Sequence, residues 1–328
     1  MTAQAPTVAF RPRRLGHANL YVRDLEASMA FYNGVCGLEE VYREPEVSAG
    51  FLSNGNTHHD LGLMQAKVRG GGTFVTKASE VTKIVARNLE PGLNHLGWEM
   101  NTKDELIAAW LRAKASPAVR ITRTVNHQIT HSIYVEDPDG NQHEFYADQL
   151  EDWRTIFRPA HDELLTVHWD PSNEPHSDRA FWRDVTEFRT VPEAIFHPRA
   201  ITHVGLIAKD FPAMRDFFEN VAGLDVNTEA SSEDALFFTG QSRISLLLFA
   251  PRPNPGAGLR YIAFELSDAG ELSQALRRSQ AAGIPVETVS AVGDARGAVL
   301  RDPDGLSVLL YASLSPRQLL SLGSAIIA

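Results

Sequence analysis

The stretch HANLYVRDLEASMAFYNGVCGL (residues 17–38) decides the fold, because the chain repeats it without a gap as HVGLIAKDFPAMRDFFENVAGL (residues 203–224). Each copy has an apolar segment, an Asp, apolar residues at helical spacing and a Gly. Asp24 is a predicted helix N-cap, and Gly37 is predicted to end the helix. An internal repeat of this length predicts a duplicated strand-helix module.

A second pair of similar stretches extends the repeat. LNHLGWEMNTKDELIAAWLRA (residues 93–113) resembles LRYIAFELSDAGELSQALRRS (residues 259–279), and each leads to an Asp-Pro-Asp-Gly turn, at Asp137 and Asp302. One module alone would leave a sheet face bare, whereas two modules can combine into a curved sheet. We therefore predict an α+β fold of four βαβββ modules in two pairs, each pair forming a partly open barrel of mixed sheet with helices outside.

The predicted boundaries follow the repeats. The modules are residues 14–66, 93–148, 200–250 and 258–312. The predicted domains are residues 1–150 and 200–328, joined by a connecting segment, 151–199, whose aromatic content indicates that it packs against them. The Gly70-Gly71-Gly72 run predicts a mobile loop.

Composition excludes several classes of function. The 328 residues are 43% hydrophobic and 22% charged, which is typical of a globular protein. The net charge of −10, without a dense basic run, argues against nucleic acid as a partner. We see neither a signal peptide nor an apolar run long enough to span a membrane. With Cys36 as its single cysteine, the chain is expected in the cytoplasm.

Strand alternation assigns side chains to the concave face of the first predicted barrel. His17, Asn19 and Tyr21 share one side of their strand, and the apolar residues between them share the other. The same test places His95 inward, at the position equivalent to His17. Glu144 lies in the last strand of the same module, where a carboxylate among aromatic residues needs a partner.

Two imidazoles and one carboxylate converging on one cavity predict a metal site. This donor set leaves coordination positions open and is typical of non-haem Fe(II) centres, although Zn(II) or Mn(II) accept similar ligands. A single strand His is more often hydrogen-bonded within a core. Three such residues at equivalent positions of paired modules favour metal binding.

These residues also carry a family resemblance. GHANLYVRDLEASMAFYNGVCGL, LNHLGWEM and DPDGNQHEFY resemble the vicinal oxygen chelate superfamily, and within it the type I extradiol catechol dioxygenases. The resemblance implies Fe(II), sometimes Mn(II), held by His17, His95 and Glu144. It also implies a homo-oligomer.

Three further positions resemble the ring-cleaving members of that superfamily. THHDLGLM resembles the strand that carries a proton-transferring His, which corresponds to His59. NHQITHSIY resembles the segment with a pocket His and a pocket Tyr, which correspond to His127 and Tyr134. His131 competes with His127 for the first of these positions. As single residues, His59 and Tyr134 are equally compatible with structural roles.

The order of the halves departs from the family pattern. In the best-known extradiol enzymes the metal lies in the C-terminal pair of modules, whereas here His17, His95 and Glu144 correspond to His203, Tyr261 and Leu309 in the second half. We therefore expect the metal in the first half, and His203 in a structural role.

The predicted function is extradiol cleavage of a catechol-type vicinal diol with O2. One alternative is a glyoxalase-like metal-dependent isomerase, lyase or transferase of the same superfamily, in which a second Glu commonly replaces the HHDLGL strand's histidines. The other is a small-molecule binding protein, which needs no His-His-Glu set. The mostly apolar inward residues favour catechol or alkyl- and aryl-substituted catechols over acidic diols.

Overall fold

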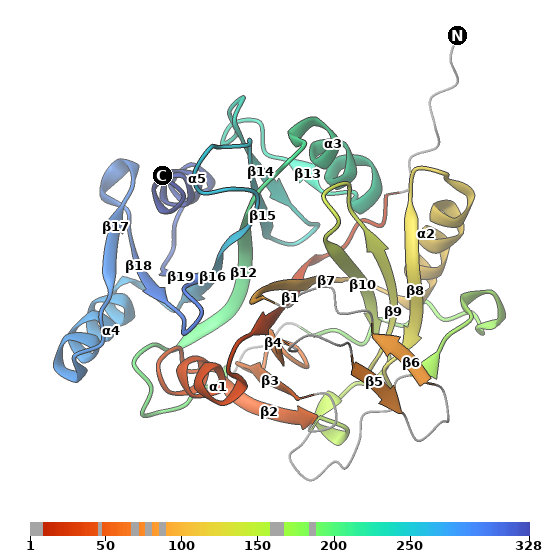
Figure 1. Cartoon of the computed structure of the whole chain (residues 1–328), viewed down its shortest axis with the longest axis horizontal. Helices are drawn as coiled ribbons and strands as arrows, with labels where there is room; N and C mark the ends of the chain where they lie inside the picture. Colours follow the sequence, from red (N-terminus) through yellow and green to blue (C-terminus); the bar gives the residue numbers. More distant parts are fainter. Residues whose placement is uncertain are drawn as a thin grey trace.

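The computed structural model describes residues 9–44, 48–66, 72–75, 81–84, 90–157, 167–183 and 188–328, the side chains of 72–75 and 81–84 excepted. Gly70 and Gly71 of the predicted loop lie outside the described residues. Two large sheets lie side by side, with β1 next to β12 (Figure 1). No helix among the described residues is long and apolar enough to cross a membrane.

The first sheet has the strand order β11-β8-β9-β10-β7-β1-β4-β3-β2. Its elements and those beside it are β1 (Arg14–Val22), α1 (Leu25–Gly34), β2 (Glu39–Glu44), β3 (Ala49–Ser53), β4 (Leu61–Gln65), β7 (Gly92–Glu99), α2 (Lys103–Ala115), β8 (Arg120–Asn126), β9 (Thr130–Glu136), β10 (Gln142–Asp148) and β11 (Val167–His168). A separate two-stranded sheet contains β5 (Gly72–Val75) and β6 (Val81–Ile84). The connecting segment contributes the short helices η2 (Trp153–Thr155) and η3 (Pro171–Asn173).

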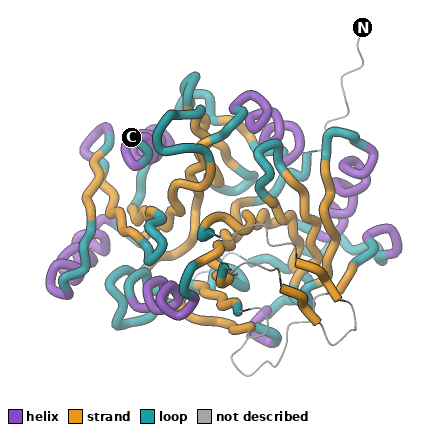
Figure 2. Tube along the Cα trace, viewed as in Figure 1, coloured by secondary structure: helices purple, strands orange, loops and turns teal. Residues whose placement is uncertain are grey.

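The second sheet has the order β13-β14-β15-β12-β16-β19-β18-β17. Its half contains β12 (Pro198–Ile207), α3 (Phe211–Asp216), η4 (Phe217–Ala222), β13 (Asp225–Val226), β14 (Ala235–Thr239), β15 (Ile244–Phe249), β16 (Gly258–Leu266), α4 (Ala269–Ala282), β17 (Glu287–Ser290), η5 (Val292–Asp294), β18 (Arg296–Arg301), β19 (Ser307–Tyr311) and α5 (Pro316–Ile326). Both sheets mix parallel and antiparallel pairs, and neither closes among the described strands. The predicted fold class is confirmed. Most helices lie at the periphery (Figure 2).

The repeated Asp residues begin their helices as predicted. The Asp24 side chain accepts a hydrogen bond from the backbone N–H of Ala27 at 3.1 Å, and Asp210 accepts one from Ala213 at 3.1 Å. The first helix ends at Gly34, before the predicted Gly37, which nevertheless adopts a left-handed φ of 79°. The Asp cap therefore has the same role in both copies, while the helix ends differ.

One apolar core lies between the two halves. Leu20 of β1 and Leu206 of β12 belong to the same cluster of buried residues, and their exposed fractions are 2% and 1%. Trp169 and Phe196 of the predicted connecting segment are buried in that cluster as well. The described parts of this segment are therefore packed, as their aromatic content indicates, and the division into domains at residues 150 and 200 stays a prediction.

Each Asp-Pro-Asp-Gly turn accepts a hydrogen bond from the half of the molecule to which it does not belong. Asp304, in the turn of the second half, accepts a hydrogen bond from the backbone N–H of Arg23 at 2.9 Å. Asp139, in the turn of the first half, accepts one from the backbone N–H of Lys209 at 2.7 Å. Arg23 and Lys209 are equivalent positions of the repeat, so the two contacts form a reciprocal clasp.

The concave face of the second sheet is filled by helix α5. Leu319 and Leu322 of this helix form a buried cluster with Tyr261 and Leu309 of the sheet. A Cβ on Gly323 would lie 2.5 Å from the Tyr261 hydroxyl, so only a glycine permits this close approach. The concave face of the first sheet has no helix of comparable length among the described elements, and the predicted site residues lie there.

Candidate metal centre

Strand register brings the three predicted ligands together. His17 on β1 and Glu144 on β10 both pair with Gly97 of β7, which lies between them. His95, two residues before Gly97, points to the same side of β7. A Cβ on residue 97 would lie 2.1 Å from His17 Nε2, so the glycine makes room for the imidazole.

The donor atoms of these residues converge. His17 Nε2 lies 3.3 Å from His95 Nε2 and 3.2 Å from Glu144 Oε2, and His95 Nε2 lies 2.9 Å from the same carboxylate oxygen. Their exposed fractions are 1%, 6% and 4% in the order His17, His95, Glu144. Three buried ligand atoms within reach of one point could hold one metal ion.

The protonation states also fit a metal. Burial lowers the pKa of His17 to about 4, so this imidazole is neutral near pH 7. Burial alone would raise the pKa of Glu144, but hydrogen bonds from His17 and His95 outweigh it and hold the pKa well below its ordinary value. The set therefore offers an ionised carboxylate and a neutral imidazole, as divalent metals require.

Asn94 orients His95. Its side-chain oxygen lies 2.9 Å from His95 Nδ1 and can only accept, so Nδ1–H donates to it. Nε2, the other ring nitrogen, then faces Glu144, and a metal would take the place of the proton that it donates to the carboxylate. Such an outer hydrogen bond is typical of metal-ligating histidines, because it selects the tautomer that coordinates.

The adjacent His58 and His59 form a second group with His17. The three imidazoles bring nitrogen atoms within 4.8 Å of one another. This group lacks a carboxylate, and the His59 ring is stacked on the His17 ring, with centroids 4.1 Å apart. Stacked rings direct their nitrogen lone pairs sideways and not at each other, so the group with Glu144 fits a metal better.

His59 is held beside the cluster by Asn19. Asn19 Oδ1 accepts a hydrogen bond from His59 Nε2 at 3.1 Å, while His59 Nδ1 has no hydrogen-bond partner among the described residues. Burial lowers the pKa of His59 well below its ordinary value. The side chain is therefore a neutral imidazole whose basic Nδ1 is free.

His127 and Tyr134 lie on the other side of Glu144. His127 Nε2 is 3.1 Å from the Tyr134 hydroxyl and 3.9 Å from Glu144 Oε1. His131, the competing candidate, points away from the cluster to Trp169, with ring centroids 4.5 Å apart. Register explains the difference, since His131 and Tyr134 lie on opposite faces of β9.

Burial also sets the protonation of this second pair. It lowers the pKa of His127 to about 4 and raises the pKa of Tyr134 well above its ordinary value. Near pH 7 the imidazole is neutral and the phenol is protonated. Tyr134 can therefore donate a hydrogen bond from its hydroxyl.

Several residues of the site were not predicted from the sequence. Tyr146 stacks on the far side of His17, with ring centroids 5.2 Å apart, and His58 Nδ1 lies 3.7 Å from Asp148 Oδ1. A signal for Tyr146 and Asp148 was available, because they follow Glu144 at the two-residue period of one strand face. The role of Gly97 had no signal, because it depends on which side chains the neighbouring strands place against it.

A buried ionic group lies farther along the same face. Glu99 accepts hydrogen bonds from Arg13 at 2.5 Å and from Arg14 Nε at 2.7 Å. Burial alone would raise the pKa of Glu99, but the two guanidinium groups keep it below its ordinary value. This end of the concave face is therefore charged and paired.

The second half has the same register with other side chains. His203 and Leu309 both pair with Ala263, as His17 and Glu144 pair with Gly97, and Tyr261 corresponds to His95. His203 Nδ1 lies 3.0 Å from the Thr202 hydroxyl. The residue correspondence predicted from the repeat agrees with the strand pairing.

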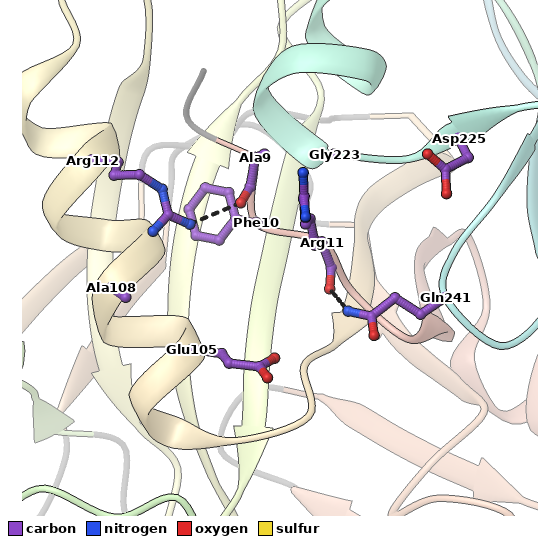
Figure 3. A pocket seen from close by; sticks show the side chains of 9 residues that line it. All are labelled: Ala9, Phe10, Arg11, Glu105, Ala108, Arg112, Gly223, Asp225 and Gln241. Carbon is purple, nitrogen blue, oxygen red and sulfur yellow. Dashed lines mark hydrogen bonds between the residues drawn. The ribbon is translucent and has the colours of Figure 1, made fainter. Parts of the chain in front are cut away.

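A different hollow lies at the junction of the halves. This groove, of about 570 Å³, runs between α2 and the start of β13, where Arg112 donates to Ala9 O at 2.9 Å and Gln241 donates to Arg11 O at 2.5 Å (Figure 3). Its lining contains no histidine, and its arginines lie among carboxylates such as Glu105. It lacks the donor set of the candidate centre.

Comparison with known proteins places the chain in a family. The model of the glyoxalase/bleomycin resistance protein/dioxygenase superfamily matches residues 14–145 and 200–310, which contain most strands of both sheets. The chain belongs to this superfamily. The predicted resemblance is confirmed, and the two matched stretches correspond to the two pairs of modules.

Relatives of the chain include proteins named as dioxygenases. The chain is 23% identical over 283 residues to a catechol-2,3-dioxygenase of Bacillus subtilis (strain 168), covering 83% of this chain and 90% of that relative. It is 30% identical over 137 residues to a biphenyl-2,3-diol 1,2-dioxygenase of Rhodococcus globerulus, covering 42% of this chain and 64% of that relative. The crystal structure of BphC, a halotolerant catechol dioxygenase, matches with a TM-score of 0.62 at 14% identity, covering 93% of this chain and 88% of that one. The last likeness shows the fold alone.

Proposed function

We propose that the protein cleaves the ring of a catechol-type vicinal diol next to the diol, using O2 at a mononuclear Fe(II) centre. The observation that carries the proposal is the convergence of His17, His95 and Glu144 beside two neutral imidazoles and one phenol. Relatives named as catechol dioxygenases support the reaction class.

Two imidazoles and one carboxylate would hold the metal, with Fe(II) favoured and Mn(II) acceptable to the same ligands. When bound, such a metal supplies a centre that can hold a diol and O2 together and pass electrons between them. Asn94 contributes by fixing the tautomer of His95, and Gly97 by leaving space for His17.

His59 is the base in this proposal. Its Nε2–H is occupied by Asn19, so Nδ1 is the atom that accepts a proton from a diol hydroxyl and later returns it. Burial keeps this imidazole neutral near pH 7, and stacking on His17 holds its ring next to the ligand set. A neutral imidazole of this kind is suited to proton transfer.

His127 and Tyr134 orient the reactants. The Tyr134 hydroxyl stays protonated, because burial raises its pKa, and it can donate toward an oxygen atom bound near Glu144. His127 Nε2 lies 3.1 Å from that hydroxyl, and when it donates to the phenolic oxygen the phenolic proton is left to point toward the bound oxygen atom.

The carboxylate count disfavours a glyoxalase-like reaction. The described residues place one carboxylate, Glu144, within the ligand set, and the strand where such enzymes commonly supply a second Glu has His58 and His59. A protein that only bound its ligand would not need an ionised carboxylate between two imidazoles.

Anaerobic loading with Fe(II), followed by catechol and air, tests the proposal. We expect oxygen uptake and a yellow muconic semialdehyde-type product, both abolished in His95→Ala and Glu144→Ala. Loaded protein that consumes no oxygen with catechol or with alkyl- and aryl-substituted catechols would contradict it. Isomerisation or thiol addition by protein loaded in the same way would support the glyoxalase-like alternative.

A further inference from the structure

Phe157, in the connecting segment, is an apolar residue that lies beside the candidate centre. It follows the short helix η2, and its backbone N–H donates to Trp153 O at 2.8 Å. The ring is 3% exposed and lies 4.9 Å from that of Tyr42 and 5.4 Å from that of Phe51, measured between centroids. Ile129 belongs to the same buried cluster.

Phe157 bridges the open side of the first sheet. Tyr42 and Phe51 lie on β2 and β3, at one edge of the strand order. Ile129 lies in the connection between β8 and β9, near the other edge. Phe157 belongs to the buried cluster that joins these two edges, and its ring contacts Tyr42 and Phe51 directly.

The same ring borders the histidines. Its centroid lies 6.0 Å from that of His59 with the planes 12° apart, and 5.9 Å from that of His58. His59 is stacked in turn on His17. Phe157 is therefore an apolar residue at the boundary between the proposed acid-base group and the apolar cluster.

The part of the face that holds Arg14 and Glu99 is charged. Arg14 and Glu99 are buried and paired there, and inserting an apolar substituent would separate charges that are expensive to leave unpaired. Among the described residues, the apolar cluster that borders the proposed base is the one that contains Phe157, so a diol at the candidate centre places its apolar substituents toward that cluster. Pockets bury the apolar part of a ligand against their apolar wall.

The second half offers a comparison for Phe157, because its concave face is filled by α5. Tyr146 pairs with Glu99, and Tyr311 pairs with Glu265 at the equivalent position. Counting equally far from these tyrosines, Phe157 corresponds to Leu322, which is fully buried in α5 on the concave face of the second sheet. In the second half a whole helix fills the concavity, whereas in the described part of the first half the Phe157 ring, which follows η2, lies beside His58 and His59.

We infer that Phe157 is the residue that limits the size of the substrate, because its ring blocks the direction in which a substituent on the diol must extend. The inference rests on the proposed function, since it concerns a diol bound at the same centre. Removing the ring enlarges the site toward the apolar cluster and leaves the ligand set untouched.

Anaerobic calorimetry on the Fe(II)-loaded protein tests this by binding, with no turnover. The probes are catechol and 4-phenylcatechol, and the measured quantity is the ratio of their dissociation constants. In Phe157→Ala the affinity for 4-phenylcatechol relative to catechol should rise about tenfold or more, which corresponds to about 1.4 kcal/mol. The matched control, Leu322→Ala, removes a buried side chain from the equivalent position and should leave the ratio unchanged.

If Phe157→Ala does not fold, Phe157→Leu, which introduces the residue type of the second half, should shift the ratio in the same direction, and Phe157→Trp should shift it the other way. A ratio within about twofold of wild type while both diols bind would overturn the inference and leave the proposed function standing. Failure of both diols to bind the loaded wild-type protein would overturn the proposed function as well.

Discussion

At the scale of single residues, the two halves differ by the side chains at three equivalent positions. The second half keeps His203 but has Tyr261 and Leu309 where the first has His95 and Glu144. A buried carboxylate is costly unless it is paired, and Glu144 is paired by two imidazoles. Leu309 needs no such partner and lies in a buried apolar cluster with residues of α5.

Substituting His59 separates proton transfer from metal binding. In His59→Ala we expect the metal to remain and kcat to fall by about 10²–10⁴-fold, the usual contribution of a positioned acid-base group. The measurements are metal content and single-turnover rates. His131→Ala is the matched control, because His131 points away from the cluster, and its rate should stay at the wild-type level. Loss of metal from His59→Ala would show that His59 is a ligand.

Gly97 gives a steric test of the ligand arrangement. In Gly97→Ala the new Cβ would lie 2.1 Å from His17 Nε2, so the imidazole must move and metal affinity should fall by about 10–100-fold. Metal titration of the apo protein measures this. Gly34→Ala is the control, because no atom lies within 4 Å of a Cβ there and residue 34 is helical. Equal affinities in the two variants would contradict the arrangement.

At the scale of elements, the Asp-Pro-Asp-Gly turns have a second role besides reversing the chain. Asp137, the first residue of one turn, accepts hydrogen bonds from Asn141 and His143, which hold the turn itself. Asp139 and Asp304 instead accept backbone N–H groups of the opposite half. The turn recurs in both halves because each copy binds the other half.

Removing these contacts should weaken the junction of the halves. We expect Asp139→Ala and Asp304→Ala each to lower the free energy of unfolding by about 1 kcal/mol, the usual net value of such a hydrogen bond. Their effects should add, since the two sites do not share partners. Urea unfolding measures both, with Glu287→Ala on the exposed strand β17 as a control. If Asp139→Ala and Asp304→Ala both unfold at the same urea concentration as the control, the two hydrogen bonds do not stabilise the junction of the halves.

At the scale of the whole molecule, the repeat made the fold predictable, and strand alternation placed His17 and His95 on one face, with Glu144 in the last strand of the same module. Both signals are local, because they depend on spacing along the chain. The position of Phe157 and the filling of the second concavity by Leu322 depend on contacts between distant segments, which spacing does not report. The choice between His127 and His131, by contrast, could have been made from spacing, because His131 and Tyr134 are three residues apart and lie on opposite faces of β9.

Acid should destabilise the metal-free protein over a defined range. Burial lowers the pKa of His17 and His127 to about 4 and that of His203 to about 3, below the ordinary value of 6.5. Between about pH 6.5 and pH 4 the unfolded chain binds more protons than the folded one, so stability falls as the pH falls. The pKa of Glu144 is also lowered in the folded protein, so its ionised form contributes stability that is lost as the pH falls below 4.5, the ordinary pKa of a glutamate. Chemical unfolding at a series of pH values measures this, and midpoints that stay constant over the range would contradict it.

The central claim is that Glu144 makes the first concavity a metal centre. The most direct measurement is the metal content of protein loaded anaerobically with Fe(II) and freed of excess metal, for wild type and for Glu144→Leu, which introduces the residue of the second half. We predict one bound ion per chain in the wild type and almost none in the variant, with both chains folded. Stoichiometric metal in Glu144→Leu, or none in the wild type, would contradict the claim.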